Sequence, residues 1–240
     1  MNNQSEQHIT FIAGGSKGLG LAIYQQLREA GHTLVEFSRS GDHLGHLDCD
    51  FAKPEKALNV FKTAFNEKYD QAGHINLIVN TATLEPFGPI QRAASKDINS
   101  HITINVETIT HLVRLFARAY QDHPAQKTLS YVSSGAANRA IPGMSMYSAS
   151  KAYGERLIDT FREEQKEQAM PIQNMIINPG VMDTGMQDTI RAQKKKDFPL
   201  RDHWQKLYEN NELAEPEQIA AFIIGKINNP EPGYHKAQWY

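Results

Sequence analysis

The sequence predicts a doubly wound α/β protein, in which a parallel β-sheet carries helices on both faces. Short unbroken apolar runs alternate with longer amphipathic stretches along the chain. Unbroken runs are typical of strands that helices cover on both sides of a parallel sheet. The chain has 240 residues, a length that one α/β domain can reach, and no linker or internal repeat divides it. We therefore expect a single domain over residues 1–240.

The individual elements follow from the same two patterns. Leu19, Ile23 and Leu27 recur every four residues and so share one face of a helix. The alternation of strand and helix indicates a sheet that is wound in both directions. In chain order, the sequence predicts strands at 9–13, 33–37, 46–50, 75–80, 128–133 and 172–178, and helices at 19–30, 54–69, 95–120, 147–168 and 217–228.

Two connections depart from this alternation. Residues 39–50 leave too little chain for a full crossover helix, because such a connection needs about a dozen or more residues. We therefore expect the second crossover helix to be shortened or absent, with a turn at Ser40, Gly41 and Asp42. The polar segment at about 185–215 is expected to be an insertion that forms the substrate loop. Within it, Trp204 either closes over the site or packs on the surface.

Composition and charge exclude several classes of protein. The 25 basic and 27 acidic residues leave a net charge of −2, so the surface as a whole attracts neither nucleic acid nor an anionic membrane. One cysteine allows no internal disulfide, and no apolar run approaches the ~18 residues of a membrane span. Residues 1–8 lack the basic start and apolar run of a signal peptide. We expect a cytoplasmic protein with neither nucleic-acid nor membrane partners.

A glycine-rich loop joins the first predicted strand to the first helix. Gly14, Gly18 and Gly20 form a G-x-x-x-G-x-G pattern. Glycines permit a tight turn and a close approach of the backbone to a pyrophosphate, and the start of a helix offers free N–H groups. In the first strand–helix unit, this pattern predicts a dinucleotide site of the Rossmann type.

The end of the second strand favours NADP(H) over NAD(H). An NAD site would need an acidic residue there for the ribose 2′-hydroxyl, but the strand ends in Ser38 and Arg39, and Glu36 lies too early. Arg39 can hold a 2′-phosphate through two hydrogen bonds, and Lys17 lies in the glycine-rich loop nearby. The alternative is that both cations are ordinary solvated residues.

A tyrosine–lysine pair supplies the candidate chemistry. Tyr147 and Lys151 lie four residues apart, which places a phenol and an ammonium on one face of a helix. The ammonium is expected to lower the phenol pKa from ~10, so that the phenol can protonate a carbonyl oxygen as hydride reaches its carbon. Ser134 ends the fifth strand thirteen residues before Tyr147 and would face the same crevice. Asn105 lies in the helix after the fourth strand.

These motifs, with Asn178-Pro179-Gly180 after the strand at 172–178, resemble the classical type of the short-chain dehydrogenase/reductase family over residues 8–190. Within the family, the run Met-Asp-Thr-Gly-Met-Gln at 182–187 is most similar to the branch of sepiapterin reductases and bacterial benzil reductases. Two features depart from the family pattern. Thr83 stands where a glycine is usual, and residues 233–240 contain no carboxylate side chain, which argues against a pterin held through one.

The resemblance implies a role for each catalytic residue. Tyr147 is the general acid, and Lys151 lowers its pKa and binds the nicotinamide ribose. Ser134 orients the substrate carbonyl, and Asn105 holds a water that relays protons to Lys151. Met144, Met182 and Met186 are expected to line the substrate pocket, and no metal site is expected. The expected cofactor-binding residues are Gly14, Ser16, Lys17, Gly18, Leu19, Gly20, Ser38, Arg39, Asp50, Phe51, Asn80, Thr81, Ala82, Tyr147, Lys151, Pro179, Gly180, Val181 and Thr184.

The function that these observations predict is NADPH-dependent transfer of hydride to a small ketone or dicarbonyl substrate. By analogy with the family, we expect a homodimer or homotetramer. Two alternatives stay open. One is a non-catalytic redox sensor that binds NADP(H), and the other is an enzyme of the same fold that acts as a 3-oxoacyl reductase or an alcohol dehydrogenase.

Overall fold

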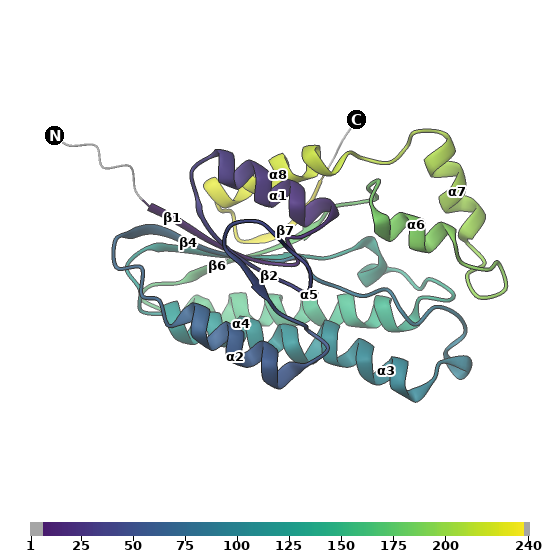
Figure 1. The fold of residues 1–240 in the computed structure, drawn as a ribbon, viewed down its shortest axis with the longest axis horizontal. Coiled ribbons are helices and arrows are strands. Elements are labelled where there is room, and N and C mark those ends of the chain that lie inside the picture. The colour runs from purple at the N-terminus through teal and green to yellow at the C-terminus, as the bar shows by residue number, and fades with distance from the viewer. Residues whose placement is uncertain (1–6, 238–240) are drawn as a thin grey trace.

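Seven parallel strands form one sheet in the computed structural model, which describes residues 7–237 (Figure 1). The strands are β1 (Gln7–Ala13), β2 (Thr33–Ser38), β3 (His46–Asp48), β4 (Ala72–Val79), β5 (Gln126–Val132), β6 (Ile172–Asn178) and β7 (Gly233–Lys236). Their order is β3-β2-β1-β4-β5-β6-β7, so the sheet extends in both directions from the central pair β1 and β4. The predicted doubly wound, Rossmann-type sheet is confirmed.

Helices cover both faces of this sheet. They are α1 (Gly18–Glu29), α2 (Pro54–Phe65), α3 (Ser95–Ile102), α4 (Thr108–Tyr120), α5 (Ser145–Gln165), α6 (Gly185–Arg191), α7 (Arg201–Glu209) and α8 (Pro216–Asn228), with short segments η1 (Ile90–Arg92), η2 (Thr103–Glu107) and η3 (Gly135–Asn138). In Figure 1, α1 and α8 lie together on one face, and α2, α4 and α5 lie on the other. Because alternate side chains of a strand point to opposite faces, Phe11 and Ile12 of β1 belong to two separate apolar cores.

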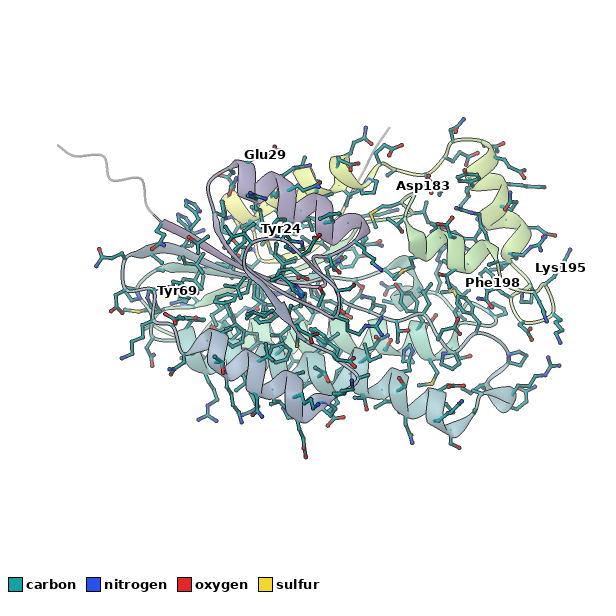
Figure 2. All side chains as sticks on the ribbon, in the orientation of Figure 1. Tyr24, Glu29, Tyr69, Asp183, Lys195 and Phe198 are labelled. Atoms are coloured by element: carbon teal, nitrogen blue, oxygen red, sulfur yellow. The ribbon has the colours of Figure 1, made fainter. Side chains whose placement is uncertain are left out.

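The connection between β2 and β3 contains no helix, as predicted. Residues 39–45 form a loop that returns beside α1. There the Tyr24 hydroxyl donates a hydrogen bond to the Leu44 carbonyl at 2.7 Å, and the Tyr24 ring packs on His43 with ring centres 4.0 Å apart. Figure 2 labels Tyr24 on the side of α1 that faces the sheet. The short loop therefore lies against the first helix through the His43 ring and the Leu44 backbone.

Several predicted elements differ from those observed. The helix predicted at 95–120 is divided, because the π-helical segment η2 separates α3 from α4. β7 pairs in parallel with β6 at one edge of the sheet, but its partly exposed residues include no apolar run that would predict a strand. The helices predicted at 54–69 and 147–168 end at Phe65 and Gln165.

The segment predicted as an insertion forms α6 and α7 (Figure 1). A parallel bridge between Met182 and Ala214 joins the two ends of this segment. No helix within residues 7–237 is long and apolar enough to cross a membrane. The prediction that residues 1–8 hold no signal peptide rests mainly on residues outside this range, and so does the part of the C-terminal prediction that concerns residues 238–240.

Candidate active site

A cleft of about 1040 Å³ opens along the carboxyl ends of the strands. This is where ligands bind in doubly wound sheets. Every residue that was predicted for the site lines this cleft, except Gly20 and Asn105. The lining includes the three predicted substrate residues, Met144, Met182 and Met186. The fold therefore brings cofactor, substrate and catalytic candidates from distant parts of the chain to one place.

The glycine-rich loop after β1 has the shape that a diphosphate requires. Gly14 adopts a φ of +84°, and a Cβ there would stand 2.9 Å from the Thr81 backbone. Gly20 lies under the same turn, where a side chain would overlap the Gly14 carbonyl. That carbonyl accepts a hydrogen bond from the Asn80 amide at 2.8 Å. No side chain caps the start of α1 at Gly18, so its first N–H groups are available to an anion.

The end of β2 presents Ser38 and Arg39 to the cleft. Glu36 is fully buried, and its carboxylate accepts hydrogen bonds from the Gly15 N–H at 2.7 Å and from the Ser38 hydroxyl at 3.1 Å. The carboxylate that would serve an NAD ribose is therefore turned into the protein. A hydroxyl and a guanidinium are left at this edge of the cleft, and both fit a phosphate group.

Tyr147 and Ser134 meet at the centre of the cleft. Tyr147 is buried at the start of α5, and the Ser134 side chain lies within reach of its hydroxyl. Ser134 also caps η3, where it accepts a hydrogen bond from the Ala136 N–H at 3.1 Å. Burial raises the pKa of Tyr147 to about 12, against the opposing effect of the Ser134 side chain. The expected lowering of this pKa is therefore wrong for this structure, because burial of the phenol raises the pKa.

Lys151 lies one turn further along α5 and is buried. Its Nζ donates a hydrogen bond to the Val132 carbonyl at 2.7 Å and lies 5.8 Å from the centre of the Tyr147 ring. Burial lowers the pKa of Lys151 to about 8, and the nearby Glu155 carboxylate acts in the opposite direction. The ammonium is thus held close to the phenol ring, with a pKa that is close to the working range.

Asn105 is buried in η2, behind the wall of the cleft. Its side-chain oxygen accepts from the Thr83 N–H at 2.8 Å, and its side-chain nitrogen donates to the Thr83 carbonyl at 2.9 Å. The same amide lies 3.0 Å from Nε2 of His101, a buried ring that also contacts the Ser150 hydroxyl at 2.9 Å. Asn105 therefore fixes the backbone at the position where Thr83 replaces the usual glycine. Its role in holding a water stays a prediction.

Apolar side chains form the wall of the cleft beside Tyr147. Met144 and Ile190 line the cleft and belong to one buried cluster with Tyr147 and Phe198, against which Trp204 packs. Figure 2 labels Phe198 beside α6 and α7. Neither Ile190 nor Phe198 is predicted from the sequence. Each lies in a mostly polar stretch, so no regular spacing of apolar residues indicates that either of them is buried.

Comparison with known proteins agrees with this geometry. The family model described as short chain dehydrogenase matches residues 8–195. The chain belongs to the short-chain dehydrogenase/reductase family. It is therefore an oxidoreductase of a family that binds nicotinamide cofactors. The predicted resemblance to the benzil reductase-like branch is confirmed.

The relatives are similar to this short-chain dehydrogenase/reductase over most of its length. It is 32% identical to a benzil reductase ((S)-benzoin forming) of Bacillus subtilis, over 90% of this chain and 91% of the relative. The benzil reductase ((S)-benzoin forming) of Bacillus cereus is 30% identical, over 92% and 94%. The crystal structure of the KRED1-Pglu enzyme superposes with a TM-score of 0.80 at 25% identity, and the match covers 95% of this chain and all of that one (100%).

Proposed function

We propose that the protein is an NADPH-dependent carbonyl reductase for apolar ketones or dicarbonyls. The observation that carries this proposal is the pair of hydroxyl side chains, Ser134 and Tyr147, that line the cleft together. It lies in one cleft with the glycine-rich loop and beside an apolar wall. A carbonyl oxygen placed between the two hydroxyls would be oriented by Ser134 and protonated by Tyr147.

The cofactor assignment rests on the end of β2. Ser38 and Arg39 line the cleft there, and the Glu36 carboxylate is buried and already bonded to Gly15 and Ser38. This arrangement favours a 2′-phosphate over a free 2′-hydroxyl. When bound, NADPH would supply the hydride.

The protonation states suit the direction of reduction. Because burial holds the pKa of Tyr147 near 12, the phenol keeps its proton at neutral pH and can act as an acid. Lys151, with a pKa of about 8 and its Nζ 5.8 Å from the ring centre, would stabilise the phenolate that remains. The water held by Asn105, as the resemblance implies, would return the proton through Lys151.

The apolar wall indicates the substrate class. Met144, Ile190 and Trp204 offer carbon surface beside Tyr147, and such surface favours aromatic or aliphatic groups that flank the carbonyl. The two relatives named benzil reductase carry the name of an aromatic diketone. We therefore propose an aromatic dicarbonyl as the preferred substrate, ahead of 3-oxoacyl thioesters and simple alcohols.

NADPH oxidation against a panel of carbonyls tests this function. We expect benzil-like diketones to be reduced with a higher kcat/KM than small diketones, pterins or oxoacyl thioesters. NADPH that binds without being oxidised by any member of the panel would favour the sensor alternative. Location in the cytoplasm and assembly as a homodimer or homotetramer stay predictions.

A further inference from the structure

Behind the glycine-rich loop, Glu36, His43 and His46 bring three potential metal ligands together. One carboxylate oxygen and two imidazole nitrogens lie within 4.8 Å of one another. Glu36 comes from β2, His43 from the short β2–β3 loop and His46 from the start of β3. The Glu36 side chain is fully buried, and the two imidazoles are only 12% and 15% exposed. We call these three residues the Glu–His–His cluster.

The distances in the cluster are close to those of a metal site. Oε2 of Glu36 lies 3.4 Å from Nε2 of His43 and 2.7 Å from Nδ1 of His46. A tetrahedral zinc ion with bonds of about 2.0–2.1 Å holds its ligand atoms about 3.3 Å apart. The His43–Glu36 pair already has this spacing, and the His46–Glu36 pair needs to open by about 0.6 Å.

Hydrogen bonding defines which ring nitrogens can bind a metal. Nε2 of His46 accepts from the Gly41 N–H at 3.3 Å, so its Nδ1 carries the proton that bonds to Glu36. A metal would replace that proton. Nε2 of His43 is shielded from solvent and has no hydrogen-bond partner among residues 7–237. A shielded ring nitrogen that faces a carboxylate without a hydrogen bond is a strong candidate for a metal ligand.

The surrounding backbone holds the imidazoles in place. A Cβ at Gly41 would stand 2.5 Å from Nδ1 of His46, so the loop packs directly against that ring. Tyr24 packs on the other ring, that of His43, from α1. The ligands are therefore supported by neighbouring residues, as metal-binding histidines usually are.

We propose that the Glu–His–His cluster binds one divalent transition-metal ion of the zinc type, with water completing its coordination. Two of its three ligands are imidazoles, which suit zinc, cobalt, nickel and copper, whereas magnesium and calcium take oxygen ligands. This site differs from the expectation, drawn from the sequence, that the protein has no metal site. The histidine spacing alone shows none, because Glu36 reaches His46 only through the pairing of β2 with β3.

The cluster is linked directly to the cofactor cleft. Glu36 accepts from Gly15 of the glycine-rich loop through Oε1 and from Ser38 through Oε2. A metal on Oε2 would release the Ser38 hydroxyl and place positive charge close to Arg39. This step rests on the proposed NADPH function. Bound zinc would then increase the affinity for NADPH more than the affinity for NADH. By linkage, bound NADPH would increase the affinity for zinc by the same factor.

Zinc titration of the untagged, full-length, metal-stripped protein tests the proposal, with a chromophoric chelator as competitor. We expect one zinc per chain and no competition from magnesium. His43→Gln and His46→Gln should each weaken zinc at least about 100-fold, since each removes one of three ligands. His74→Gln is the matched control, because His74 stacks on His8 away from the cluster, and it should bind zinc like the wild type.

Three results would overturn the site. They are zinc binding below one ion per chain, an unchanged zinc affinity in both cluster variants, or a loss of zinc affinity in His74→Gln alone. Thermal unfolding of the metal-free variants shows whether they fold. Should they not fold, cobalt(II) absorption of the wild type decides the matter: intense visible bands of a low-coordinate site support the proposal, and the weak bands of a hexa-aquo ion refute it. Zinc binding that leaves the preference for NADPH over NADH unchanged would refute the coupling between the two sites and leave both the metal site and the cofactor assignment standing.

Discussion

Replacing Arg39 with alanine should weaken NADPH selectively. Arg39 lines the cleft at the end of β2 beside Ser38, where the proposed 2′-phosphate would lie. A hydrogen bond to a charged group contributes about 1.5–3 kcal/mol, and solvent screening favours the lower end for an exposed side chain such as this one. A loss of about 1.5 kcal/mol corresponds to roughly a tenfold rise in the NADPH Kd.

The NADH Kd should change less than about twofold, because NADH has no phosphate for Arg39 to bind. Cofactor fluorescence titrations measure both constants, and the effect on NADPH should shrink at high salt. Lys53→Ala is the matched control, since Lys53 is a nearby cation that pairs with Asp50 at 3.1 Å and does not line the cleft. Equal losses for the two cofactors, or no loss of NADPH affinity, would refute the phosphate assignment.

Three further variants test the catalytic centre and its surroundings. Glu155→Gln removes a charge that raises the pKa of Lys151, so the loss of kcat/KM at alkaline pH should begin below about pH 8; an unshifted pH profile would contradict this. Asn105→Ala leaves the Thr83 N–H and carbonyl unpaired and should lower the free energy of unfolding by about 1–3 kcal/mol in urea, whereas unchanged stability would show that these bonds are dispensable. Trp204→Ala should raise KM for an aromatic diketone and leave KM for a small diketone unchanged, and equal effects on both would place the indole outside the substrate pocket.

Local patterns in the sequence were enough to predict the first six strands and the site loops, but not β7. The run at 172–178 has four apolar residues among its seven, and it forms β6 with the same bounds. The four-residue spacing of Tyr147 and Lys151 needs only helical geometry to place both on α5. The absence of the second crossover helix could also be predicted, because the number of residues between β2 and β3 is too small for one.

Features that depend on distant contacts could not be predicted. The Glu–His–His cluster exists because β3 pairs with β2, and the apolar wall exists because α6 and α7 fold over the cleft. The sign of the Tyr147 pKa shift was also missed. Spacing shows that Lys151 is near, but only the fold shows that the phenol is buried. Sequence reasoning therefore located the reacting groups and could not give the environment around them.

The turnover of Tyr147→Phe with NADPH and a diketone tests the central claim most directly. The change removes one hydroxyl from a buried ring that lies beside Ser134, and a general acid contributes about 10²–10⁴-fold to the rate. We expect kcat to fall by that amount while the NADPH Kd stays within about twofold, since the variant loses the acid and keeps the glycine-rich loop and Arg39. Turnover near the wild-type rate would contradict the assignment of Tyr147 as the proton donor.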